Sequence, residues 1–386
     1  MKILSQIFKR KKENQLFEAM QIEVCASCNI RCTFCPTTHQ HHHYGIDTMD
    51  LELFQKLALY FPWFKWVYLQ GWGEPLLHKD IWQMVQLAKG AGVKVGFTTN
   101  GTLLNQDALD NIFRMGVDQI STSIAGATSE SHGRLRVGSQ LEQIGINVVN
   151  LLQQRRAKGI NRPRVSISYM LTKDSIHELP EALKLALSWG VDDFYTTNLD
   201  YVFNQLADEQ KVFCWDEEEQ KSSSGSMEAN LRQYQEYLDV AASLASKKKI
   251  SFRSCKLAAK EQEASCELNP NKYVFITVRG DVTPCTYLAR MENPKIFRGQ
   301  SYKFPCQSFG NIQQSGLSQI LEGEEYREFC LPFKKREQAL TRLMSAFIDY
   351  EPSLLRIHQA EEEYSQHLEE NSLPKPCQVC PKPFGV

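Results

Sequence analysis

Between residues 20 and 200, short apolar or β-branched runs alternate with amphipathic stretches of helical length. This alternation predicts repeated β-α units and a parallel sheet, because a crossover helix lets consecutive strands run in the same direction. The expected strands are residues 20–24, 66–70, 93–98, 119–123, 165–170 and 193–198. Helices are expected at 51–60, 81–91, 106–115, 141–158 and 179–189, with C-terminal caps at Gly92, Gly116, Gly159 and Gly190.

Six such units indicate an α/β fold in which the sheet curls into a partial (β/α)6 barrel of the TIM type. Loops that follow the carboxyl ends of the strands form the ligand sites of such folds. We therefore expect the chemistry at that rim.

Changes of composition divide the chain into four predicted parts. Residues 1–19 form a basic N-terminal arm, and residues 20–213 form the barrel. Residues 214–265 are a linker, polar and Ser/Gly-rich at 216–228, with a helix near 228–247. Residues 266–386 form a small cysteine-rich module with short strands at 274–278 and 282–283 and a charged helical insertion at 333–372.

The composition argues against several classes of partner. Lys and Arg number 44 against 45 Asp and Glu, so no large basic field attracts nucleic acid. No apolar run reaches the roughly 18 residues that a membrane span requires. Twelve cysteines without an export signal favour metal ligation in a reducing compartment, the cytoplasm, over structural disulfides.

Three of these cysteines, Cys28, Cys32 and Cys35, form a CxxxCxxC motif directly after the first expected strand. Three thiolates on one loop can ligate three irons of a 4Fe-4S cluster and leave the fourth iron without a protein ligand. The alternative is a zinc site, for which Cys25 or His39 could provide the fourth ligand.

The second strand ends in GWGEP, residues 71–75, where glycines permit close approach of a small polar ligand. By itself this motif fits an ordinary strand-to-loop turn equally well. Its position one β-α unit after the cysteine loop puts both motifs on the same rim of the barrel.

Four motifs, taken in order, resemble those of the radical S-adenosylmethionine (radical SAM) superfamily. They are CNIRCTFC at 28–35, GWGEP at 71–75, TTNGTLL at 98–104 and STSIAG at 121–126. Within this superfamily, the sequence pattern is similar to that of the branch with anaerobic sulfatase maturases, molybdenum-cofactor enzymes and peptide-modifying maturases. The resemblance implies that the open iron chelates the amino and carboxylate groups of SAM. One electron then cleaves the sulfonium and gives a 5′-deoxyadenosyl radical.

The resemblance also implies which residues contact SAM. The motif around Gly71, Trp72, Gly73 and Glu74 would receive the methionine amino group. Asn100 and Ser123 would lie near the ribose and carboxylate, Arg136 is a further carboxylate candidate, and Phe34 would pack near the adenine. A structural role is the alternative for Asn100, Ser123 and Arg136.

Two positions depart from the family pattern. Trp72 replaces the usual second glycine of GGEP, and Ala125 stands where many relatives carry Asp. The missing carboxylate puts in doubt a ribose contact at position 125 and weakens assignment to the peptide-maturing branch.

A second cysteine set lies near the C-terminus. Cys266, Gly280 and Cys285 are spaced as Cx13Gx4C across an expected hairpin turn, FGNI follows at 309–312, and CQVC contains Cys377 and Cys380. This arrangement resembles the SPASM module, which implies that the four cysteines ligate one auxiliary 4Fe-4S cluster. A zinc ribbon is the alternative. Buried free thiols are expected at Cys25, Cys214 and Cys255, and also at Cys306 and Cys330 unless these serve as ligands.

Other polar residues receive no catalytic role from the sequence. His39, His41, His42 and His43 are interpreted as a solvated loop rather than a metal site, because adjacent histidines point in different directions. Substrate-facing candidates near strand ends are Tyr169, Thr172, Asn198 and Tyr201.

The resulting hypothesis is a radical SAM enzyme, of oxidoreductase or rearrangement type, that abstracts hydrogen from a small molecule or cofactor precursor. A fully thiolate-ligated auxiliary cluster favours electron relay, since it has no open iron. Reduced ferredoxin or flavodoxin is the expected electron donor. The alternatives are a peptide or protein maturase and, outside enzymes, a zinc- or cluster-binding regulator or electron carrier.

Overall fold

The fold was analysed in a computed structural model that describes residues 16–39, 48–215, 226–259, 263–290, 292–348 and 354–386. Three features expected from the sequence fall wholly or mostly outside these residues. They are the basic arm at 1–19, the histidines at 41–43 and the polar loop at 216–228.

One nine-stranded sheet organises the chain, in the order β11-β10-β1-β3-β4-β5-β7-β8-β9. Its central strands pair in parallel and in chain order, which confirms the six predicted strands. These are β1 (Phe17–Ile22), β3 (Phe64–Leu69), β4 (Lys94–Thr99), β5 (Gln119–Ile124), β7 (Arg164–Leu171) and β8 (Asp193–Asn198). The strands form the partial barrel that was expected.

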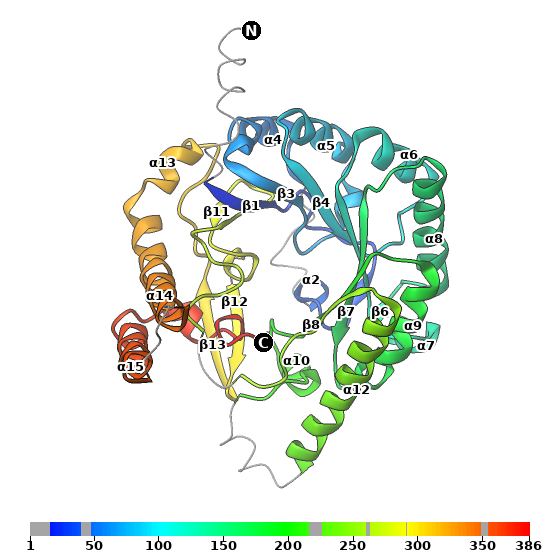
Figure 1. Cartoon of the computed structure of the whole chain (residues 1–386). Coiled ribbons are helices and arrows are strands. Elements are labelled where there is room, and N and C mark those ends of the chain that lie inside the picture. The colour runs from blue at the N-terminus through cyan, green and yellow to red at the C-terminus, as the bar shows by residue number, and fades with distance from the viewer. Residues whose placement is uncertain (1–15, 40–47, 216–225, 260–262, 291, 349–353) are drawn as a thin grey trace.

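Helices lie outside this arc of strands (Figure 1) and bury their apolar faces against it. They are α4 (Leu51–Ala58), α5 (Ile81–Gly90), α6 (Gln106–Met115), α8 (Leu141–Ala157), α9 (Leu179–Trp189) and α12 (Ser226–Lys248). In α6 the Asn105 side chain accepts a hydrogen bond from the Ala108 N–H, and Gly116 ends the helix at φ 67°. Cap residues therefore set both ends of this helix, and the sequence predicted the C-terminal one.

The sheet extends beyond the six predicted strands on both sides. β9 (Ser251–Arg253) pairs with β8, and β10 (Tyr273–Ile276) pairs with β1; both pairings are parallel. β11 (Val282–Thr283) pairs antiparallel with β10, so the strand pair expected at 274–283 is confirmed. The sequence assigned this pair to a separate C-terminal module. In the structure the two strands continue the main sheet and satisfy the backbone groups at the edge of β1.

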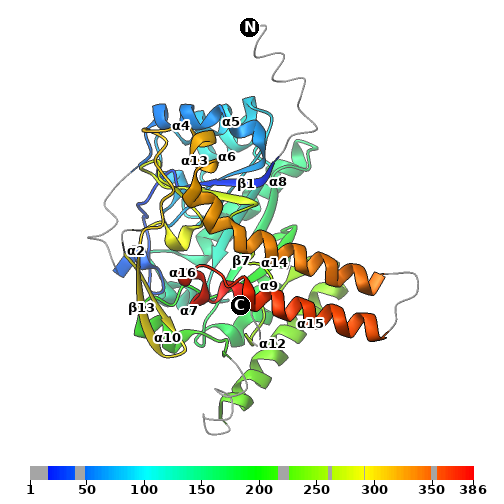
Figure 2. The ribbon, with the colours of Figure 1, turned by 90° about the vertical axis from the view of Figure 1, so that its left-hand side faces the viewer.

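The remaining C-terminal elements follow β11. They are β12 (Glu292–Phe297), β13 (Gln300–Pro305), α13 (Leu317–Leu321), α14 (Glu324–Ile348), α15 (Leu354–Glu370) and α16 (Lys375–Gln378). The charged insertion is a helical pair, α14 and α15, that projects from the body of the molecule (Figure 2). Helix α14 begins at Glu324, earlier than the predicted 333. No helix among the described residues is long and apolar enough to cross a membrane.

Short elements shape the loops at the rim. β2 (Arg31–Cys32) pairs antiparallel with β6 (Arg136–Val137). Short helices are α2 (Pro36–His39), α7 (Ser129–Leu135) and α10 (Gln205–Gln210). Single 3-10 turns are η1 (Phe61–Trp63), η2 (Pro75–Leu77), η3 (Ile176–Glu178), η4 (Thr286–Leu288) and η5 (Lys382–Phe384).

Candidate active site

The cysteine loop follows β1 and is anchored by a small second sheet. In that sheet Cys32 on β2 lies directly opposite Arg136 on β6. The Cys35 N–H donates to the Cys32 carbonyl at 3.2 Å, and α2 begins immediately after Cys35. Backbone pairing therefore fixes the loop next to the segment that carries Arg136.

The three motif cysteines lie near one another. Burial raises the pKa of each thiol, and a neighbouring cysteine raises it further: Cys32 acts on Cys28, Cys35 on Cys32 and Cys28 on Cys35. None of the three forms a disulfide. Three converging free thiols fit a 4Fe-4S cluster with one iron left open, because each thiolate then binds a different iron.

The candidate fourth ligands for zinc have other partners. The Cys25 thiol donates to the Ser27 carbonyl at 3.4 Å, and His39 Nε2 lies 2.6 Å from the Thr33 carbonyl oxygen. Both candidate ligands are therefore already engaged in hydrogen bonds to backbone carbonyl groups.

The two glycines of GWGEP pack against the segment that leads into the cysteine loop. A Cβ atom on Gly71 would lie 2.4 Å from Cγ of Glu23, and one on Gly73 would lie 2.4 Å from the Ser27 carbonyl oxygen. The sequence suggested that glycine serves ligand approach here. The contacts give a second reason, since any larger residue would push the cysteine loop away.

Glu74 ties the GWGEP loop to the end of β4. Its carboxylate accepts hydrogen bonds from the Thr99 hydroxyl at 2.8 Å, the Asn100 N–H at 2.8 Å and the Leu76 N–H at 3.1 Å. Burial raises the pKa of this carboxyl. Glu74 is thus surrounded by protein donors and positions Asn100.

Asn100 continues this network to the cysteine loop. Its side-chain amide donates to Oδ1 of Asn29 at 2.8 Å and lies 3.7 Å from the Cys28 sulfur. The structure thus brings three of the sequence motifs together at one rim. A hydrogen bond to the sulfur is one of the interactions by which proteins tune iron-sulfur clusters.

Arg136 is a buried cation with an unused donor. Its residue is 7% exposed, and among the described residues its Nε has no hydrogen-bond partner. Its neighbours include the buried Glu74 carboxyl and the Cys32 thiol, and its positive charge opposes the rise that burial causes in the pKa of each. Buried charged groups are rare unless they are paired, so this cation with a spare donor suits an anionic ligand.

Ser123 and Ala125 lie at the end of β5, on the same rim. Ser123 is half-buried, whereas Ala125 is buried and its N–H donates to Nδ1 of His132 at 3.4 Å. Nε2 of His132 lies 3.0 Å from the Ser139 hydroxyl. Burial and the neighbouring Arg136 lower the pKa of His132 to about 3, so this imidazole is neutral.

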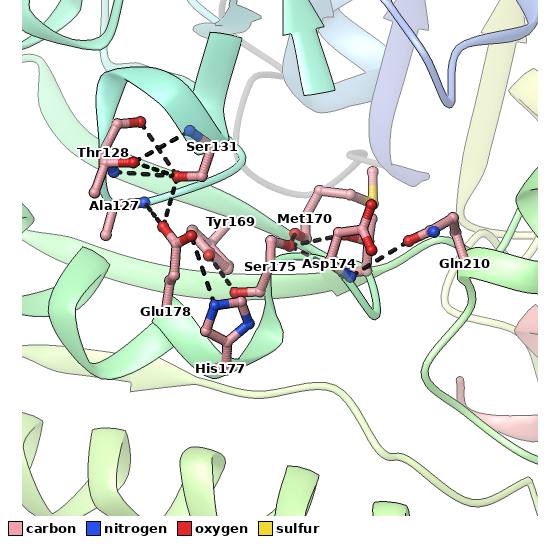
Figure 3. A network of polar contacts seen from close by, with 11 residues as sticks. Ala127, Thr128, Ser131, Tyr169, Met170, Asp174, Ser175, His177, Glu178 and Gln210 are labelled. Carbon is pink, nitrogen blue, oxygen red and sulfur yellow. Dashed lines mark hydrogen bonds and ion pairs between the residues drawn. The ribbon is translucent and has the colours of Figure 1, made fainter. Parts of the chain in front are cut away.

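Phe34 packs beside the apolar residues that follow β8. With Leu199, Thr172 and others it lines a pocket of about 150 Å³. Backbone and side-chain contacts fix the turn at this pocket: the Lys173 N–H donates to the Gln210 carbonyl at 2.9 Å. The Asp174 N–H lies 3.3 Å from Gln210 Oε1, as Figure 3 shows.

Two substrate-facing candidates belong to that structural turn. Tyr169 donates to the Ser175 carbonyl at 2.7 Å, and the Thr172 hydroxyl lies 2.9 Å from that of Ser175. Figure 3 shows the same turn leading to Glu178, whose carboxylate accepts from the Ala127 N–H at 2.6 Å. These contacts give Tyr169 and Thr172 a role in holding the loops after β5 and β7.

The other two candidates lie beyond β8. The Asn198 side chain donates to the Lys256 carbonyl at 2.8 Å, while its Oδ1 has no partner among the described residues. Tyr201 is buried, and its ring lies 5.1 Å from both Trp72 and Tyr287.

Trp72 connects the GWGEP loop to the C-terminal module. Its indole N–H donates to the Thr286 carbonyl at 3.1 Å, and its ring lies 5.9 Å from that of Tyr287. The Trp72 backbone N–H donates to Glu23, which forms a 2.5 Å ion pair with Arg290. Glu23 and Arg290 were missed from the sequence, although a carboxylate at the end of a buried strand is a signal for such a pair.

The four auxiliary cysteines come together as predicted. Cys266, Cys285, Cys377 and Cys380 line one largely apolar pocket. Burial raises the pKa of Cys266 well above its usual value, and the other three cysteines raise it further. The Cys380 N–H donates to the Cys377 carbonyl at 3.3 Å. Four thiols around one apolar pocket suit a fully ligated cluster.

The remaining cysteines lie outside both sets. Cys214 is buried beside a backbone bridge to Ala258, and the Cys255 sulfur lies 3.3 Å from the Thr196 hydroxyl. Burial raises the pKa of Cys306 to about 11 and that of Cys330 to about 12. The side chains that act on these thiols are Asp281 and Arg290 for Cys306 and Tyr326 for Cys330.

Comparison with known proteins finds two family matches in the chain. Residues 22–186 match the radical SAM superfamily model, and residues 266–344 match the SPASM model, an iron-sulfur cluster-binding domain. The boundaries at 213 and 265 remain predictions.

Curated relatives align over most of the chain. The tungsten-containing aldehyde ferredoxin oxidoreductase cofactor-modifying protein of Pyrococcus furiosus is 27% identical, covering 80% of this chain and 82% of that protein. The AdoMet-dependent heme synthase of Methanosarcina barkeri is 22% identical, covering 83% and 91%.

Solved structures share the fold. Streptococcus suis SuiB bound to S-adenosylmethionine has a TM-score of 0.59 at 16% identity, covering 84% of this chain and 70% of SuiB. The protein anSMEcpe with bound AdoMet and Cp18Cys peptide has a TM-score of 0.57 at 15% identity, covering 92% and 97%.

Proposed function

Since the chain is a radical SAM enzyme with a C-terminal SPASM iron-sulfur domain, we propose that it reductively cleaves SAM and abstracts hydrogen from a small molecule or cofactor precursor. The observation that carries the proposal is the convergence of Cys28, Cys32 and Cys35 beside the buried Arg136. Such a site offers an open iron to the amino acid end of SAM and a cation to its carboxylate.

The cofactors are SAM and 4Fe-4S clusters, and the three motif cysteines are the proposed ligands of the SAM-binding cluster. When bound, this cluster supplies the electron that breaks the sulfonium bond of SAM. The loop at residues 71–74 is the proposed site of the methionine amino group, and Glu74 acts there by positioning Asn100. Asn100 and Ser123 are proposed near the ribose and carboxylate.

Phe34 is the proposed neighbour of the adenine. Support comes from the pocket that it lines with Leu199, at the rim that carries the cysteine loop. A flat aromatic side chain suits packing against a purine ring.

Cys266, Cys285, Cys377 and Cys380 are the proposed ligands of a single auxiliary cluster. Full ligation by thiolates favours electron relay, because no iron is left to bind substrate. Reduced ferredoxin or flavodoxin is the proposed electron donor. With these cofactors and this electron donor, the proposed class is an oxidoreductase, and the proposed location is the cytoplasm.

The substrate class follows the curated relatives that match most of the chain. Their names describe modification of a tungsten-enzyme cofactor and synthesis of heme. We therefore place a cofactor precursor or similar small molecule ahead of a peptide.

Anaerobic reconstitution followed by detection of 5′-deoxyadenosine tests the function. With dithionite and SAM, the wild-type protein should form 5′-deoxyadenosine, and Cys28→Ala, Cys32→Ala and Cys35→Ala should each abolish it. Cys330→Ala is the matched control, because this buried thiol lies outside both cysteine sets and should leave the product unchanged. A reconstituted wild type that forms no 5′-deoxyadenosine contradicts the proposal.

A further inference from the structure

Three of the four auxiliary cysteines are followed within two residues by a polar side chain of one shared network. Glu267 comes directly after Cys266, Tyr287 comes two residues after Cys285, and Lys382 comes two residues after Cys380. Three separate loops thus contribute to the same cluster of side chains.

Asp200, just after β8 of the barrel, lies at the centre of this network. The Tyr287 hydroxyl donates to its Oδ1 at 2.7 Å, and Lys382 pairs with its Oδ2 at 2.5 Å. Lys382 also pairs with Glu267. Both carboxylate oxygens of Asp200 therefore bind residues of the auxiliary loops.

Burial strengthens the central pair of this network. Asp200 is 7% exposed and the Lys382 side chain is 15% exposed, whereas the Glu267 side chain is 65% exposed. Buried charges are weakly screened, so removing one partner of the Asp200–Lys382 pair leaves the other uncompensated. The network also touches the first site, because the Tyr287 ring lies 5.9 Å from Trp72.

We propose that Asp200 is a positioning residue that fixes the auxiliary-cluster loops on the barrel rim and sets the reduction potential of that cluster. The inference rests on the proposed function, since it requires that the four cysteines hold an iron-sulfur cluster. The Asp200 carboxylate pairs with Lys382, and Lys295 is a second buried cation that lines the auxiliary pocket. Because the reduced cluster is the more negative form, removing the negative charge of Asp200 should favour reduction.

Potentiometric titration monitored by electron paramagnetic resonance tests the inference without using turnover. Asp200→Asn should shift the midpoint potential of the auxiliary cluster to a more positive value and broaden its spectrum. Asp200→Glu retains the charge and should restore most of the wild-type potential. The SAM-binding cluster should keep its own potential in both variants.

Asp118→Asn is the matched control. Asp118 is 9% exposed and also pairs with a lysine, Lys89, at 2.5 Å. It precedes β5, however, and so lies at the amino end of the strand, away from the rim at the carboxyl ends. This variant removes the same charge and should leave the auxiliary potential unchanged. Glu267→Gln leaves Asp200 intact and should shift the auxiliary potential in the same direction as Asp200→Asn. It serves as the test if Asp200→Asn does not fold.

Each possible result is decisive. An unchanged auxiliary potential in Asp200→Asn, or in Glu267→Gln if the first variant does not fold, overturns the inference alone. An equal shift in Asp118→Asn also overturns it. A wild-type protein without any auxiliary-cluster signal overturns the proposed role of the four cysteines as well, so the two failures are distinguishable.

Discussion

Arg136 shows how the burial and hydrogen bonding of a single residue bear on its proposed role. The sequence marked it only through the family resemblance, among three side chains for which a structural role was the alternative. Its burial and its unpartnered Nε depend on the pairing of β2 with β6, which joins segments far apart in the chain. Such long-range contacts are beyond local sequence patterns.

Replacing Arg136 should weaken SAM binding. A hydrogen bond to a charged group contributes roughly 1.5–3 kcal/mol, so Arg136→Gln should raise the dissociation constant of SAM by about 10- to 100-fold. Equilibrium dialysis with reconstituted protein measures this change. Arg156→Gln, at an exposed arginine of α8, is the control and should bind normally. Unaltered affinity in an Arg136→Gln protein with full iron content would contradict the assignment.

His132 should make stability depend on pH in the acidic range. Its pKa is about 3 in the folded protein, below its ordinary value, so the unfolded state binds the proton more readily. The stabilisation is complete above the unfolded-state pKa, about 6.5, and is lost as the pH falls toward 3, by at most about 1.4 kcal/mol per pH unit. The free energy of unfolding, measured with urea at several pH values between 7 and 5, should change less with pH for His132→Gln than for the wild type. The same change in both proteins would contradict the prediction.

At the scale of elements, the six central strands and their helices follow from periodicity and caps, as α6 with Asn105 and Gly116 shows. The outer strands could not be placed in this way. β9 and β10 are short, and their attachment to β8 and β1 is decided by which edges remain open after the barrel forms. The sequence therefore predicted the strand pair at 274–283 but assigned it to a separate module.

Trp72 joins two elements that the sequence treated apart, the GWGEP loop and the η4 turn. Trp72→Phe keeps a ring but loses the hydrogen bond to the Thr286 carbonyl, so the free energy of unfolding should fall by about 1 kcal/mol. Urea unfolding followed by circular dichroism measures it. Trp82→Phe, at a half-buried tryptophan on α5, provides the comparison. If Trp72→Phe is no less stable than Trp82→Phe, the loop is held by other contacts.

In the whole molecule, two cysteine sets lie on either side of a shared group of aromatic rings. Cys380→Ala should remove one cluster, lowering the iron content by about four atoms per chain, while the cysteine loop after β1 stays intact. The variant should retain cleavage of SAM but lose turnover of the true substrate. Iron counting together with 5′-deoxyadenosine formation checks both parts. Loss of all cleavage in Cys380→Ala would show that the two sites are not separable.

The open iron beside Cys28 is the central claim, and electron-nuclear double resonance tests it most directly. The sample is reduced protein whose four auxiliary cysteines are replaced by alanine, with SAM labelled with nitrogen-15 at its amino group. We predict a hyperfine coupling between that nitrogen and the remaining cluster. Bound SAM without such a coupling would contradict ligation at the open iron.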